Sequence, residues 1–219
     1  MIQKPELDSI SHDGDRFSII RLVFDSEVKQ SEHFYRELRT AIPVDFTFVT
    51  IGVRNWNHDL SPWCSPPVFG KDGFGDGATD LLGFIEGNVV PDIVEPIIIG
   101  GYSLTGLFSL WSGYESKSFR NIAAISPSVW FPGWIDYASE RRIQADSVYL
   151  SLGNKESHTK NEVVSKVAEN LCKQYDLLCD NTDCILEWNE GGHFDNVERR
   201  VVDAFIKITN MLYKTTHNP

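Results

Sequence analysis

Short apolar runs alternate along the whole chain with segments of helical periodicity, and this alternation constrains the fold more than any other feature. Most of the runs are continuously apolar, which is typical of strands that are covered on both faces. The six runs span residues 17–24, 46–53, 96–100, 122–125, 148–152 and 185–188. They predict an α/β protein with a six-stranded, mostly parallel sheet and helices on both of its faces.

Five amphipathic segments separate or follow these runs, and we expect each to form a helix. They cover residues 32–41, 78–90, 104–114, 159–175 and 196–213. The last segment repeats apolar residues on one face, among them Val197, Val201 and Phe205. We therefore expect it to pack along the sheet as the closing element of the fold.

Length and charge limit the domain organisation and the partners. The chain has 219 residues, which suits one domain over 1–219, with a polar segment over 1–16 and no separate lid domain. Its net charge of -11 disfavours nucleic acid and anionic membrane surfaces. The polar N-terminus lacks the apolar core of a signal peptide, so we expect a cytoplasmic protein. A homo-oligomer is left open.

Four cysteines occur, and their spacing matches no zinc motif, so we expect free thiols and no metal site. They are Cys64, Cys172, Cys179 and Cys184. A bridge between Cys179 and Cys184 remains an alternative for an oxidising compartment.

The sharpest local signal is the stretch IIIGGYSLTGLFSLW at residues 97–111, where a buried strand turns directly into an amphipathic helix. This pattern is typical of a nucleophile elbow with Ser103 at its tip. Gly101 stands two residues before the serine, as the strained turn requires. Thr105 occupies the place of the usual second glycine, and Gly106 follows it. A glycine-rich turn of purely structural purpose is the alternative.

A serine nucleophile needs a histidine base, and the base needs an acid to orient it. His193 follows Gly191 and Gly192 in the loop between the last strand and the last helix. Glu156 is the first carboxylate after the strand at 148–152. The alternatives are a solvated loop histidine and a glutamate that only favours the start of the next helix. Two backbone N–H groups, from Leu104 and Ser26, are the candidate oxyanion donors.

Two long loops leave the carboxyl ends of strands, where open α/β sheets bind ligands. They span residues 54–77 and 126–137 and are rich in aromatic residues. The candidate substrate-binding residues are Arg54, Trp56, Trp63, Tyr102, Trp130 and Trp134. Each tryptophan could equally be part of the core.

Four further motifs accompany the elbow. They are Val23-Phe24-Asp25-Ser26, Arg54 followed by Asp59-Leu60-Ser61-Pro62, Ser126-Pro127-Ser128-Val129-Trp130, and Gly191-Gly192-His193. With them the chain resembles the esterase-D-type esterases of the α/β-hydrolase superfamily, which include enterobactin-type siderophore esterases and feruloyl esterases. The resemblance covers the chain from about residue 17 to the last helix.

This resemblance implies ester hydrolysis without a cofactor, through an acyl-enzyme on Ser103, with His193 as base and then acid and Glu156 as the orienting acid. Ser26 and Thr105 depart from the family pattern, which implies modest turnover or an unusual substrate. The family's usual two leading strands are missing, which implies a truncated sheet.

Three other functions were weighed against ester hydrolysis, and two of them stay open. An acyltransferase or a peptidase could use the same scaffold, and a non-catalytic hydrolase-fold protein could bind a ligand or partner. A nucleotide-binding α/β protein is excluded because no phosphate-cradling glycine loop is present. We expect a small-molecule ester as the substrate.

Overall fold

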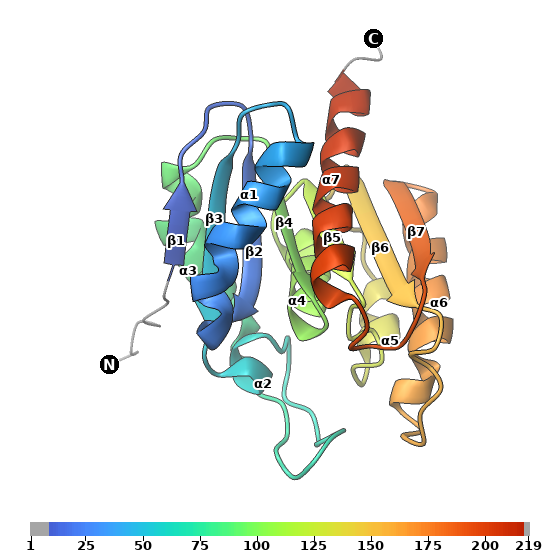
Figure 1. The fold of residues 1–219 in the computed structure, drawn as a ribbon. Coiled ribbons are helices and arrows are strands. Elements are labelled where there is room, and N and C mark those ends of the chain that lie inside the picture. The colour runs from blue at the N-terminus through green and yellow to red at the C-terminus, as the bar shows by residue number, and fades with distance from the viewer. Residues whose placement is uncertain (1–8, 217–219) are drawn as a thin grey trace.

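A single twisted sheet of seven strands forms the centre of the computed structural model, which describes residues 9–216 (Figure 1). The strand order is β1-β3-β2-β4-β5-β6-β7. All neighbouring strands are parallel except β1, which is antiparallel to β3. The bounds are Ser9–His12 (β1), Ser18–Phe24 (β2), Thr47–Val53 (β3), Ile97–Tyr102 (β4), Asn121–Ile125 (β5), Ser147–Gly153 (β6) and Asp183–Asn189 (β7). The predicted mostly parallel α/β fold is confirmed.

The predicted number of six strands is wrong by one, because β1 lies within the N-terminal polar segment over 1–16, where we expected no strand. Its four residues pair with β3 at the edge of the sheet, and none of them is buried. The ring of His12 stacks on Tyr35 with ring centroids 3.8 Å apart. Only Ile10 is apolar in this strand, so its sequence carried no strand pattern.

Helices cover both faces of the sheet (Figure 1). On one face lie α1 (Ser31–Ala41) and α7 (Val197–Thr216), and on the other lie α3 (Ala78–Asn88), α4 (Leu104–Glu115) and α6 (Val167–Cys179). The short helices are α2 (Trp56–Asp59), α5 (Trp134–Ser139), and the 3₁₀ turns η1 (Asp25–Gln30), η2 (Val90–Asp92) and η3 (Val164–Lys166).

Two apolar clusters, one on each side of the sheet, form the core. Successive strand residues alternate between them: Ile19 packs toward α1 and α7, whereas Ile20 packs toward the opposite helices. Phe205 of α7 and Phe108 of α4 are both fully buried. The periodicity that predicted α7 as the closing helix thus corresponds to its buried face.

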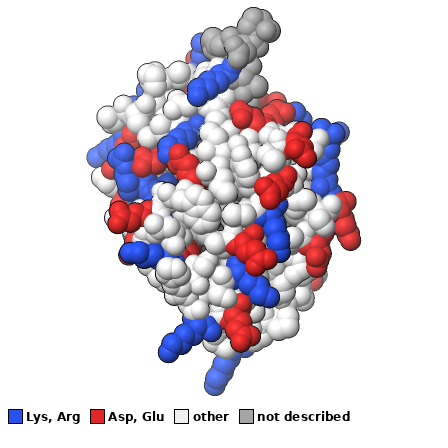
Figure 2. Space-filling view, turned by 90° about the vertical axis from the view of Figure 1, so that its right-hand side faces the viewer, with Lys and Arg blue, Asp and Glu red and all other residues white. Residues whose placement is uncertain are grey.

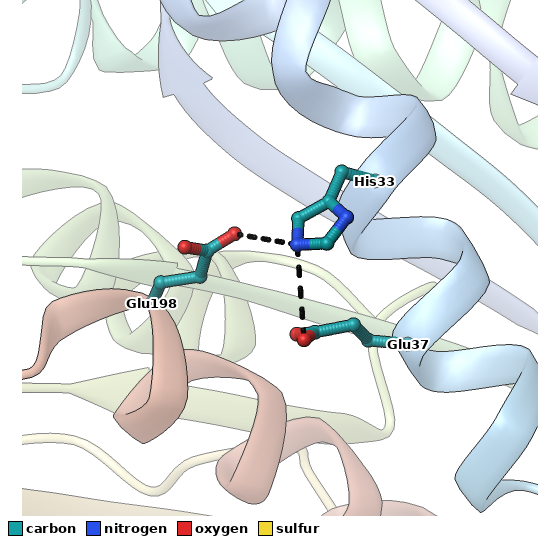
Figure 3. A group of neighbouring side chains, drawn as sticks. All are labelled: His33, Glu37 and Glu198. Atoms are coloured by element: carbon teal, nitrogen blue, oxygen red, sulfur yellow. Dashed lines mark ion pairs between the residues drawn. The ribbon is translucent and has the colours of Figure 1, made fainter.

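Helices α1 and α7 also meet at the surface. There the His33 Nε2 atom lies 3.8 Å from Glu37 Oε1 and 3.8 Å from Glu198 Oε1 (Figure 3). All three side chains are exposed. Exposed ion pairs of this kind contribute little to stability, so we treat the group as a surface contact between the two helices.

Helix α6 starts eight residues later than the predicted helix over 159–175. Asn161 explains the difference, because its Oδ1 atom accepts hydrogen bonds from the Val163 and Val164 N–H groups. Its Nδ2 atom donates to the Val68 carbonyl at 2.8 Å. These bonds hold residues 159–163 against the long 54–77 loop instead of in a helix.

The 54–77 loop projects beyond the carboxyl ends of the strands, below α2 in Figure 1. An isolated bridge between Ser65 and Phe74 ties the loop to itself. Phe74 packs on Phe131 of the second long connection, with ring centroids 5.1 Å apart. In the part of the chain that the structure describes, this loop lies over the carboxyl ends of the strands, and no separate lid is present.

Acidic and basic side chains are mixed across the face seen in Figure 2, without a continuous basic area. Among the described helices, none has the length and apolar character to cross a bilayer. All four cysteines are free.

Candidate active site

Ser103 occupies the sharp turn between β4 and α4. Its φ of 61° and ψ of -119° lie in a region that residues other than glycine rarely adopt. The Ser103 N–H donates to the Ile125 carbonyl at 3.0 Å, and the Ser128 N–H donates to the Ser103 carbonyl at 3.1 Å. Bonds from the neighbouring strand and its loop therefore hold the strained turn.

The departure from the usual glycine pattern has a structural explanation. A Cβ atom on Gly101 would lie 2.3 Å from the Thr105 Oγ1 atom, so the Thr105 side chain occupies the space that Gly101 leaves. The Thr105 hydroxyl donates to the Tyr102 carbonyl at 2.7 Å. Gly106 approaches the backbone instead, because a Cβ there would lie 3.0 Å from the Gly101 carbonyl oxygen.

The structure brings Ser103, His193 and Glu156 together from three separate segments of the chain. Ser103 Oγ lies 3.2 Å from His193 Nε2, and His193 Nδ1 lies 2.7 Å from Glu156 Oε2. A Cβ on Gly153 would lie 2.5 Å from the Gly191 carbonyl oxygen, so this glycine lets the loops that carry the acid and the histidine approach each other. The contacts match the geometry of a nucleophile, a base and an orienting acid.

Four donors surround the Glu156 carboxylate. Besides His193, its Oε1 atom accepts hydrogen bonds from the Ser126 hydroxyl at 2.6 Å, the Gly153 N–H at 2.7 Å and Arg200 Nη2 at 2.9 Å. Burial alone would raise the pKa of Glu156, but these donors outweigh it and lower that pKa to about 2. The carboxylate is thus ionised at neutral pH.

Arg200 also lies in the candidate site, although no local pattern in the sequence pointed to it. Its Nη1 atom donates to the Tyr102 hydroxyl at 3.1 Å and to the Gly192 carbonyl at 3.2 Å. The Tyr102 hydroxyl in turn donates to the His193 carbonyl, and burial raises the pKa of Tyr102 to about 12. The available signal was an arginine three residues after Val197, on the apolar face of the last helix.

Three further residues lie on segments that border the site. Ser128 Oγ lies 3.4 Å from Ser103 Oγ and is buried, although the sequence reasoning gave it no role beyond its motif. Leu104 is the first residue of α4, where a backbone N–H has no partner within its helix. Ser26 lies in the first turn of η1 and is exposed, whereas Phe24 and Glu27 on either side of it line the adjacent cavity.

A cavity of about 840 Å³ opens at Ser103. Three of the predicted substrate-binding residues line it: Trp56, Tyr102 and Trp130. Aromatic rings continue around it, because Phe24 lies 5.4 Å from Trp56 and Phe69 lies 5.3 Å from Trp130 between ring centroids. Phe194, which is 87% exposed, also lines the cavity beside the histidine.

Three predicted substrate-binding residues are not brought to this cavity. Trp134 is fully buried in the core, and its Nε1 atom donates to Gln174 Oε1 at 2.8 Å. Trp63 donates to the Pro132 carbonyl at 2.9 Å and so joins the two long loops. Arg54 Nε lies 3.4 Å from Asp25 Oδ2. For the two tryptophans, the alternative of an anchoring or core role describes the structure better than substrate binding.

No protein-family model and no curated protein matches this sequence. Solved structures do match the fold. Siderophore hydrolase EstA from Aspergillus nidulans has a TM-score of 0.70 at 19% identity, over 90% of this chain and 83% of that chain. An IroE-like serine hydrolase from Shewanella oneidensis has a TM-score of 0.70 at 17% identity, over 88% of this chain and 70% of that chain. Siderophore hydrolase EstB from Aspergillus nidulans has a TM-score of 0.68 at 18% identity, over 92% of this chain and 88% of that chain.

The chain therefore shares the α/β fold of these solved hydrolases, and its serine, acid and histidine follow the chain order predicted for an α/β hydrolase. Within that class, the structures it matches include siderophore hydrolases and serine hydrolases.

Proposed function

We propose that this chain is a carboxylic ester hydrolase that acts through an acyl-enzyme on Ser103. The observation that carries the proposal is the continuous contact from Ser103 Oγ through His193 to an ionised Glu156, at one end of an apolar cavity. The names of the matched structures agree with this chemistry, although at 17–19% identity they support the fold alone.

In the proposed reaction, His193 Nε2 accepts the Ser103 proton while Oγ attacks the ester carbonyl carbon. Glu156 keeps the Nδ1–H tautomer of His193 in place and stabilises the imidazolium that forms. The Leu104 N–H and a second N–H from the first turn of η1, assigned to Ser26, hold the oxyanion. His193 then protonates the leaving alcohol, and water releases the acid by the same steps in reverse order.

The cavity favours an ester with a large apolar or aromatic group. Its aromatic residues come from β2 and β4, from the two long loops and from the loop that carries His193. Aromatic side chains provide much of the contact area in small-molecule sites, and the polar groups fix the orientation of the bound molecule. We propose that the 54–77 and 126–137 loops select the substrate, since no separate lid is present among the described residues.

Labelling with a fluorophosphonate probe tests the nucleophile. We expect the wild-type protein to be labelled on Ser103 and the Ser103→Ala variant to remain unlabelled. Ser128→Ala is the matched control, because this hydroxyl lies 3.4 Å away and should be dispensable for labelling. Hydrolysis of nitrophenyl and feruloyl esters should fall by at least about 10³-fold in Ser103→Ala.

Equal labelling of wild type and Ser103→Ala would contradict the proposal. A wild-type protein that is not labelled, and that hydrolyses no ester of the panel, would favour the non-catalytic binding protein instead. Transfer of the acyl group to an added alcohol or amine in preference to water would indicate an acyltransferase.

A further inference from the structure

Arg21 places a cation in the wall of the active-site cavity. It lies in β2, and like Ile19 it points to the face of the sheet that α1 and α7 cover, where its guanidinium carbon lies 3.9 Å from the centre of the Phe34 ring. Arg21, Val23, Glu27, Tyr102, Val197 and Val201 all line the cavity. We call this part the Arg21 lobe.

Within residues 9–214 the guanidinium of Arg21 makes neither an ion pair nor a hydrogen bond, and it lies over the Phe34 ring. Arg200 offers the contrast, since its guanidinium nitrogens bond four different residues. Arg21 is half-buried at the cavity wall, so its guanidinium is partly desolvated and gains no hydrogen bond from the described part of the protein. Its five N–H donors are therefore free for a ligand.

The acidic groups nearest to Arg21 do not neutralise it directly. Glu27 and Glu198 attract it from a distance, and burial outweighs them and lowers the pKa of Arg21 to about 10, which leaves it charged at neutral pH. Glu198 is exposed and faces His33 (Figure 3). Glu27 is exposed as well, so water screens its charge.

The position of Arg21 relative to the nucleophile follows from the strand register. Arg21 pairs with Gly100 of the neighbouring strand β4, three residues before Ser103. At about 3.3 Å per strand residue, the two Cα atoms are offset by about 10 Å along the strand direction. A group that contacts Arg21 can thus belong to the same small molecule as an ester that reaches Ser103.

We propose that the Arg21 lobe binds a carboxylate of the substrate, so that the enzyme prefers esters that carry one free carboxylate. This inference rests on the proposed ester hydrolysis. A guanidinium fork matches a carboxylate with two parallel hydrogen bonds. The net charge of -11 disfavours a substrate with several negative charges. The carboxylate can lie on the acyl part or on the alcohol part of the ester.

Matched pairs of esters test both arrangements. On the acyl side, the nitrophenyl monoester of glutaric acid is compared with its neutral isostere, nitrophenyl 5-methylhexanoate. On the alcohol side, the butyrate ester of 6-hydroxyhexanoate is compared with that of 6-methylheptan-1-ol. We define the carboxylate preference as the kcat/KM of the carboxylate ester divided by that of its neutral isostere. We expect this ratio to exceed one in at least one pair and to fall about tenfold or more in Arg21→Met.

Further variants separate binding from structure. Arg21→Met should lose more kcat/KM on each carboxylate ester than on its neutral isostere, and its unfolding temperature shows whether the loss of the contact with Phe34 changes the fold. Arg21→Lys should give an intermediate ratio, since it keeps the charge without the fork. Glu27→Gln should raise the ratio, because it removes a negative charge from the lobe.

Calorimetric binding of hexanoate and of 6-hydroxyhexanoate to wild type and Arg21→Met gives a readout that needs no turnover. Binding that depends on Arg21 supports the inference even if Ser103 labelling fails. Equal carboxylate preference and equal binding in the two proteins would overturn it, while labelling of Ser103 would leave the proposed hydrolysis standing.

Discussion

Glu156 connects most of the candidate site through one carboxylate. One oxygen orients His193, and the other accepts hydrogen bonds from Ser126, Gly153 and Arg200. Because Arg200 also binds the Gly192 carbonyl, it fixes the histidine loop and the acid together. We regard Arg200 as a positioning residue, since it acts on the reacting groups through Glu156 and Tyr102.

The low pKa of Glu156 predicts a defined pH dependence of stability. The folded-state pKa of about 2 lies below the ordinary value of 4.5, so the carboxylate stabilises the folded protein above pH 4.5, and this contribution is lost as the pH falls toward 2. Glu156→Gln cannot titrate. We expect the stability advantage of wild type over Glu156→Gln to shrink by about 2 kcal/mol between about pH 6 and pH 3.

Urea unfolding of both proteins across this pH range measures the effect. Glu169→Gln is a suitable control, because Glu169 is exposed and pairs with Lys173 on the same helix. A constant difference between wild type and Glu156→Gln across the range would contradict the assignment of Glu156 as a strongly bonded carboxylate.

At the residue scale, the sequence indicated the candidate catalytic residues better than the residues that hold them in place. Ser103, His193 and Glu156 could be chosen because each follows a strand at the carboxyl edge of the sheet. Trp134 could not be separated from a substrate-binding residue, because an aromatic ring on a loop fits a core equally well. Arg200 lies 44 positions from its partner Glu156, and such a distant pairing leaves no local pattern.

Among the elements, the turn between β4 and α4 depends on a steric exchange between two residues. Gly101 carries no Cβ, and the Thr105 side chain occupies the space next to it. The element therefore keeps the strained Ser103 conformation even though the second glycine of the usual pattern is displaced to Gly106.

This exchange predicts a compensating pair of substitutions. Gly101→Ala should destabilise the protein by about 1–3 kcal/mol, because the new methyl group would lie 2.3 Å from Thr105 Oγ1. The double variant Gly101→Ala with Thr105→Gly should regain part of this loss. Thermal unfolding of the single and double variants tests the pair, and strictly additive effects would contradict the proposed exchange.

Element boundaries were predictable where periodicity was strong and the neighbours were apolar. Helices α1, α3, α4 and α7 begin within one residue of their expected starts. The start of α6 was not predictable, because Asn161 bonds to Val68 in a distant loop. Strand β1 was missed because backbone pairing with β3 forms it, with little help from its own side chains.

For the whole molecule, the free cysteines test the packing of the 54–77 loop and of the α6 and β7 region together. Cys64, Cys172 and Cys179 are exposed, whereas burial raises the pKa of the half-buried Cys184 to about 12. We expect iodoacetamide to modify the first three in the native protein and to modify Cys184 only after unfolding. Peptide mass mapping measures this order.

Because no disulfide contributes to the fold, a reducing agent should leave the unfolding temperature unchanged. A peptide that links Cys179 to Cys184 in the non-reduced digest would contradict this expectation and would restore the alternative of a bridged pair.

The sequence by itself determined the α/β class, the succession of the main strands and helices along the chain, and the residues able to carry nucleophilic chemistry. Those properties depend on local periodicity and on position relative to strand ends, which a linear pattern records. The tertiary structure decided which tryptophans face the cavity, that Arg200 supports the acid, and that Arg21 lines the cavity without a partner. These depend on contacts between distant segments, whose packing no local pattern encodes.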